Sequence, residues 1–63
     1  MSEYKERIKI ELAELSEKME KLSTFMKSEK FSQIDANNQM LLIAQYALME
    51  KYAECLNLRI TLA

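Results

Sequence analysis

Residues 40–62, MLLIAQYALMEKYAECLNLRITL, decide the fold because they carry two adjacent lines of mostly apolar side chains at helical spacing. The first line, called the inner seam below, consists of Leu42, Tyr46, Met49, Ala53, Leu56 and Ile60. The second line, called the outer seam, consists of Leu41, Gln45, Leu48, Tyr52, Cys55, Arg59 and Leu62. Spacings that alternate between three and four residues are typical of a helix packed against other helices. The sequence therefore predicts a helix over about residues 36–62.

The two seams together cover more surface than one neighbouring helix can hide. At 100° per residue they span about 200° of the helical wheel, and Met40, Ile43 and Leu58 widen the apolar area further. A large exposed apolar patch of this kind marks an interaction surface. We therefore expect copies of the chain to associate through this helix. The expected interface residues are Leu41, Gln45, Leu48, Cys55 and Leu62.

A second helix is predicted over about residues 2–27, with Ser2 as its cap. It has one narrow apolar stripe, which consists of Tyr4, Ile8, Leu12, Leu15, Met19, Leu22 and Met26. The helical period fails over residues 28–35, where Ser28 is expected to start a single short turn and Asp35 to cap the next helix. The predicted fold class is all-α: a two-helix antiparallel hairpin, one domain over residues 1–63, that assembles into a homo-oligomeric bundle.

The composition of the chain excludes several classes of function. The chain has 63 residues, a formal net charge of −1, one Cys and no His. A chain this short buries only about 60% of its unfolded surface and usually needs reinforcement, which again favours self-association. The missing His and single Cys leave no zinc site, no intramolecular disulfide and no usual catalytic base, so we predict no enzyme, no metal and no cofactor. Near-neutral charge argues against DNA binding. We expect no membrane span or signal peptide, and a location in a cytosol.

Polar residues inside the outer seam are the anomaly of this sequence. Gln45, Tyr52 and Arg59 lie seven residues apart and therefore stack along one line. A buried guanidinium needs an acceptor. In one interpretation Arg59 pairs with a Glu of a neighbouring subunit while Gln45 sets the register. In the other, Arg59 binds an anionic ligand, Thr61 adds a hydroxyl, and Tyr52 stacks a base.

A second candidate cluster lies near the start of the chain. Tyr4, Lys5 and Arg7 place an aromatic ring beside two cations, which is a combination suited to a nucleotide. The same combination occurs at ordinary helix starts, so both interpretations stay open.

The spacing of several residues resembles a family of small phage helical-hairpin proteins, including members from crAss-like phages. The matching positions are Lys21, Leu22, Phe25, Met26, Ser28 and Phe31, followed by Leu41, Leu42, Gln45, Met49, Tyr52, Leu56, Arg59 and Ile60. In size and architecture the chain is also similar to the phage cyclic-nucleotide sponges of the anti-CBASS type. That resemblance implies an oligomer whose ligands sit between subunits, held by cations on phosphates and by aromatic stacking on bases.

The leading hypothesis is a phage-encoded homo-oligomer that sequesters a cyclic di- or trinucleotide immune signal. Its expected ligand-binding residues are Arg59, Thr61, Tyr52, Tyr4 and Arg7. The alternative is a protein–protein inhibitor or adaptor that docks an amphipathic helix on a host or phage protein, with Ile10 and Leu58 as exposed anchors. A small DNA-binding regulator is a weaker third hypothesis.

Overall fold

The computed structural model describes residues 2–63, with side chains from Glu3 onward. Helix α1 spans Ser2–Met26, the short helix α2 spans Glu29–Ser32, and helix α3 spans Ala36–Leu62. Residues 2–63 form no strand, so the predicted all-helical fold class is confirmed. The side chain of Ser2, expected to cap α1, lies outside the described part of the chain.

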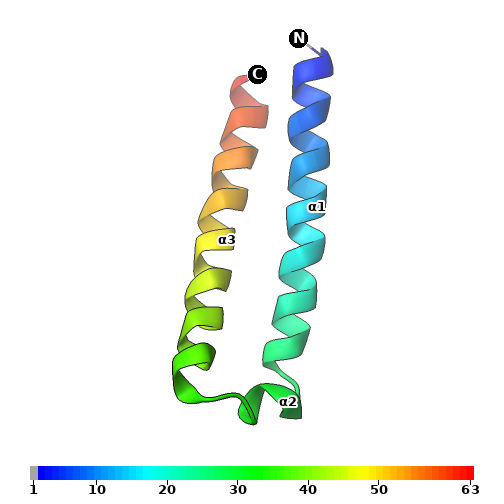
Figure 1. The fold of residues 1–63 in the computed structure, drawn as a ribbon. Helices are drawn as coiled ribbons and strands as arrows, with labels where there is room; N and C mark the ends of the chain where they lie inside the picture. Colours follow the sequence, from blue (N-terminus) through cyan, green and yellow to red (C-terminus); the bar gives the residue numbers. More distant parts are fainter. Residues whose placement is uncertain (1) are drawn as a thin grey trace.

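Helices α1 and α3 lie side by side and run in opposite directions, with α2 joining them at one end (Figure 1). Helix α1 begins and helix α3 ends at the other end of this helical pair. The molecule measures 47 × 15 × 11 Å, and its radius of gyration of 14.5 Å exceeds the roughly 11 Å of a compact domain this size. A rod of this shape has much surface and little interior.

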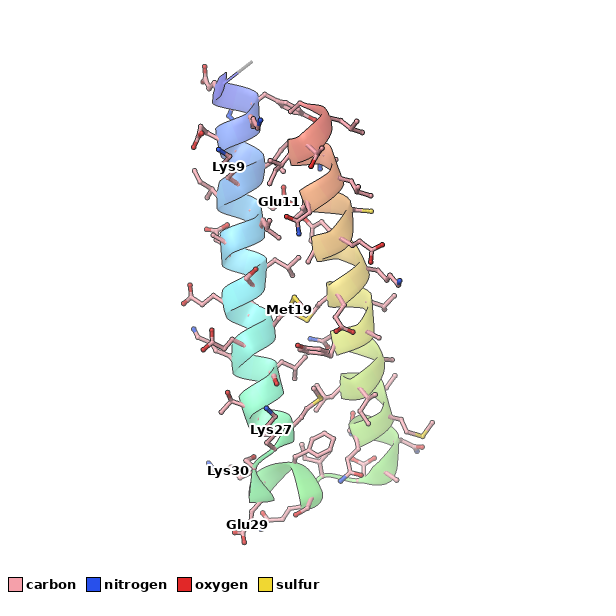
Figure 2. All side chains as sticks on the ribbon, turned by 180° about the vertical axis from the view of Figure 1, so that it is seen from behind. Lys9, Glu11, Met19, Lys27, Glu29 and Lys30 are labelled. Carbon is pink, nitrogen blue, oxygen red and sulfur yellow. The ribbon has the colours of Figure 1, made fainter. Side chains whose placement is uncertain are left out.

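The core is correspondingly thin. Only Ile8, Leu15 and Leu56 are buried among the described residues, with 2%, 7% and 0% of their surface exposed. Half-buried side chains extend this core along the pair: Leu12, Met19, Met49, Ala53 and Ile60. Figure 2 shows Met19 reaching from α1 into the space between the helices. Every residue of the inner seam is buried or half-buried, because α1 covers that line of α3.

The bend between the long helices is built without glycine or proline. Ser28 has extended backbone angles and precedes α2, and its hydroxyl donates to the carbonyl of Phe25 over 2.6 Å. The rings of Phe25 and Phe31 meet edge to face, with centroids 6.2 Å apart and planes at 88°. The Gln39 side chain donates to the Phe31 carbonyl over 2.8 Å. These contacts fasten α2 to both long helices and close that end of the pair.

Asp35 caps α3 as the sequence predicted. Its carboxylate accepts the backbone N–H of Asn38 over 3.2 Å and the Asn38 side-chain amide over 2.7 Å. The hydrogen bond from the Asn38 side chain is the main cause that lowers the pKa of Asp35 below its ordinary value, followed by the bond from the Asn38 backbone. A helix begun in this way needs no glycine or proline before it.

Charged side chains occupy the outside of the rod. The ion pairs are exposed and local, within one turn of a helix: Arg7–Glu3, Lys9–Glu6, Lys21–Glu17 and Lys51–Glu54. Pairs of this kind contribute little stability each. Among residues 2–63, no helix combines the length and the apolar run needed to cross a bilayer.

Candidate functional site

The outer seam of α3 faces solvent along its whole length. All seven of its residues are exposed, and Leu48 and Leu62 keep 70% and 85% of their surface. Of the nine large hydrophobic side chains that are exposed in the described part, seven belong to α3. This agrees with the wheel argument, since α1 covers the inner seam and leaves the outer one free. Cys55, an expected interface residue of that seam, is exposed in the single chain.

Arg59 and Tyr4 meet at the end of the rod where the chain ends lie. The Arg59 Nη2 atom donates to the Tyr4 phenolic oxygen over 3.0 Å. The guanidinium carbon also lies 5.9 Å from the centre of the Tyr4 ring, within range of a cation–π contact. The antiparallel packing of α1 and α3 therefore joins the two candidate clusters of the sequence, one from each end of the chain.

The acceptor for Arg59 comes from its own chain. Both sequence interpretations sought it outside, in a neighbouring carboxylate or an anionic ligand, and the structure supplies Tyr4 instead because residue 4 lies level with residue 59. The pKa of Arg59 is raised, first by the hydrogen bond to Tyr4 and then by the electrostatic attraction of Tyr4, with Glu11 and Cys55 contributing less. The guanidinium remains a cation, and N–H groups beyond the one used on Tyr4 stay available as donors.

The other candidate ligand residues differ in how they lie relative to the contact between Arg59 and Tyr4. Arg7 lies one turn after Tyr4 on α1, is exposed, and pairs with Glu3 over 3.3 Å. Tyr52 lies on the same line of α3 as Arg59, about 10 Å away along the axis. The structure does not bring Thr61 to Arg59: its hydroxyl donates to the Asn57 carbonyl over 3.1 Å, and two residues on a helix point about 200° apart.

A shallow groove of about 490 Å³ runs along the other flank of the helical pair. None of the outer seam residues lines it. Its floor is apolar and its rim carries hydroxyl and amide groups; the rim residues include Ser16, Ser23, Thr24, Tyr46 and Asn57. Lys27, which follows α1 at the bend (Figure 2), and Glu20 supply the charges of the groove.

Sequence reasoning missed this groove, although a signal was present. Ser16 and Ser23 lie seven residues apart, directly beside the apolar stripe of α1, and so form a polar line next to the core. We did not single out that line from the sequence. Within residues 2–63, no three acidic or cysteine side chains converge in a way that could hold a metal ion.

Comparisons with known proteins place the chain in a family. Residues 2–62 match the family described as Sequestin. A relative in Enterobacteria phage T4, named "Uncharacterized 7.5 kDa protein in denB-rIIB intergenic region", is 43% identical over 60 residues, which cover 95% of this chain and 94% of the relative. No solved structure matches the chain. The expected similarity to small phage proteins is thus confirmed, and the chain belongs to the Sequestin family.

Proposed function

We propose that this protein binds and withholds a small anionic ligand, a cyclic di- or trinucleotide, at the end where Tyr4 and Arg59 meet. The contact between these two residues is the observation that supports the proposal most directly. It fixes a guanidinium beside an aromatic ring on an exposed surface. The guanidinium can donate two parallel hydrogen bonds to a phosphate, and the ring offers a face on which a base can stack.

Sequestration fits this chemistry better than turnover. Arginine and tyrosine bind and orient a nucleotide, whereas hydrolysis would need an activated nucleophile or a general base poised near neutral pH. The family description, Sequestin, also fits a protein that withholds something. In the proposed role the phage protein hides the signal from a host effector in the host cytoplasm.

The proposed binder is a homo-oligomer. A ligand on a single chain would touch one side of an exposed surface, with Arg7 as the nearest further cation on α1. A symmetric assembly would repeat the site and could supply its second wall. The exposed outer seam, which includes Arg59, supports this arrangement.

Titration calorimetry with a panel of cyclic di- and trinucleotides tests the proposal. We expect at least one to bind at micromolar concentration or tighter, and Arg59→Gln to weaken that binding about tenfold or more. Lys51→Gln is the matched control, since it removes an exposed cation from the same helix, where Lys51 pairs with Glu54. Absence of heat across the whole panel for the wild-type protein would remove the proposal.

A second candidate function is supported by two exposed side chains. Ile10 on α1 and Leu58 on α3 keep 59% and 58% of their surface and belong neither to the core nor to the outer seam. They could anchor the protein on a host or phage partner as an inhibitor or adaptor. Affinity purification from infected cells would then recover one partner in equal amount, and Ile10→Ser would lose it while keeping self-association.

A further inference from the structure

Glu11 differs from the other acidic residues of this chain in its burial. In the described structure its side chain is half-buried, whereas all the other aspartates and glutamates are exposed. The ion pairs between described residues do not involve it. Holding a carboxylate partly out of water without a partner costs free energy. The position of Glu11 therefore needs an explanation beyond a solvated helix surface.

Glu11 lies on the flank of the helical pair that carries the Tyr4–Arg59 contact. Tyr4 and Glu11 are seven residues apart, which puts them on one line of α1 about 10 Å apart along the axis. Figure 2 shows Glu11 on the side of α1 that faces α3. Tyr4 is the main cause of the raised pKa of Arg59, and the negative charge of Glu11 adds to it. The carboxylate and the guanidinium therefore share one surface.

Tyr52 lies level with Glu11 on the neighbouring helix. The helices are antiparallel, and Tyr4 lies level with Arg59. Seven residues forward from Tyr4 on α1 and seven residues back from Arg59 on α3 therefore reach the same height. Tyr52 keeps 44% of its surface exposed, so its ring offers a face to a base. One flank of the rod thus carries a cation beside one aromatic residue and a carboxylate beside another.

We infer that Glu11 hydrogen-bonds to the Watson–Crick edge of a base stacked on Tyr52 and selects guanine. This inference rests on the proposed function and names the class of cyclic nucleotide that the site takes. An ionised carboxylate accepts hydrogen bonds at two oxygen atoms and donates none. Guanine presents two adjacent donors on that edge, N1–H and the 2-amino group, which match the two oxygens in parallel. Hydrogen bonds to an ionised acceptor are stronger than those between neutral groups.

The other bases do not present this pair of donors. Adenine has the N1 lone pair beside its amino group, and cytosine has the N3 lone pair beside its amino group. Uracil has a single N–H between two carbonyl oxygens. Each of these bases sets an acceptor against the carboxylate, and acceptors that face each other lose their hydrogen bonds to water without replacing them. Glu11 therefore discriminates by disfavouring these bases as well as by binding guanine.

The same carboxylate sets the direction of the ligand along the rod. A phosphate is repelled by Glu11 and attracted by Arg59, so it lies against the guanidinium on the side of Tyr4. The base then extends toward the bend, to the height of Tyr52. Arg59 and Tyr52 are about 10 Å apart along the axis, a spacing that suits a nucleotide because a sugar separates its phosphate from its base.

Calorimetry with three cyclic dinucleotides of equal charge and identical backbone tests the inference. Cyclic di-GMP carries both donors on each base, cyclic di-IMP lacks the 2-amino groups, and cyclic di-AMP has an acceptor in place of the N1–H donor. The wild-type protein should bind cyclic di-GMP about tenfold or more tightly than cyclic di-AMP, with cyclic di-IMP between them.

Glu11→Gln gives a second measurement, in which the two ligands should respond differently. The amide keeps one acceptor oxygen but loses the negative charge, so cyclic di-GMP should bind about tenfold more weakly. Cyclic di-AMP should lose no affinity, because the substitution removes a charge that repels its phosphates. A variant that had unfolded would lose both ligands. Glu17→Gln is the matched control: Glu17 is exposed on the same helix, pairs with Lys21 over 3.5 Å, and should affect neither affinity.

The outcomes separate this inference from the proposed function. Equal affinity of the wild-type protein for cyclic di-GMP and cyclic di-AMP would overturn the role of Glu11 and leave sequestration standing. A Glu11→Gln protein whose affinities for both ligands change by one common factor would do the same. Absence of binding by every nucleotide of the panel would remove the proposed function and this inference with it.

Discussion

Arg59 donates a hydrogen bond of 3.0 Å to the phenolic oxygen of Tyr4, a residue 55 positions earlier in the chain. This contact joins the first turn of α1 to the last turns of α3. It is the long-range side-chain hydrogen bond of the site, since the ion pairs of the described residues are local. At this end of the rod, the contact between Tyr4 and Arg59 therefore adds to the apolar packing of Ile8 and Ile60.

Removing the acceptor should loosen the first turn of α1 without unfolding the protein. Tyr4→Phe keeps the ring and its cation–π contact but removes the oxygen that Arg59 uses. Amide exchange should become faster near the start of α1, with little change in Tm, because the contact is exposed. Arg7→Gln, which breaks only the local pair with Glu3, should leave Arg59 and its exchange pattern unchanged.

Because the core is thin, shortening a single buried side chain should destabilise the protein strongly. Leu56 is fully buried between the helices. Leu56→Ala should lower the free energy of unfolding by about 2–5 kcal/mol, which is most of the stability that so small a core supplies. Thermal unfolding followed by circular dichroism should become broad or start from a partly unfolded state. Leu58→Ala is the control, because that side chain on the same helix keeps 58% of its surface. A Leu56→Ala protein with an unchanged Tm would contradict the described packing.

The cap at Asp35 should show in the dependence of stability on pH. Its folded pKa is lowered, so the stabilisation is complete above the ordinary value of 3.8 and is lost as pH falls through the folded pKa. Asp35→Asn caps without titrating. We expect the Tm difference between wild type and this variant to shift in favour of Asn when pH drops from about 5 to about 2. A difference that stays constant would show that Asp35 does not cap α3 in solution.

The outer seam predicts a position-specific effect on assembly. Leu48→Glu puts a carboxylate at an exposed apolar position in the middle of the seam, and sedimentation should show the oligomer dissociating. Ile43→Glu is the matched change, since Ile43 is exposed on the same helix but outside the seam, and it should leave the oligomer intact. Dissociation by both variants would mean that the interface extends beyond the seam.

The sequence predicted most of the helical packing because periodicity is a local signal. The inner seam is covered by α1, and the outer seam is exposed, as the 200° wheel argument required. Ser28 precedes a single helical turn, and Asp35 caps α3, because capping depends on neighbours within three residues. The observed α1 ends at Met26, next to the expected end at residue 27.

The candidate site was harder to predict because it depends on which residues of α1 lie beside which residues of α3 along the helical pair. Nothing local states that residue 4 lies beside residue 59, so the acceptor of Arg59 was sought in another molecule. Closeness in sequence misled in the opposite way for Thr61, which lies two positions from Arg59 and points away from it. The groove beside Ser16 and Ser23 needed the partner helix to form its second wall.

Helix α1 begins and helix α3 ends at the same end of the rod as the Arg59–Tyr4 contact, which has a practical consequence for experiments on this protein. An affinity tag, fluorophore or fusion partner attached at either terminus would crowd that end and could mask a ligand. The bend around α2 lies at the far end of the rod (Figures 1 and 2), with Glu29 and Lys30 exposed there. Labels and surface attachment are better placed at those two residues.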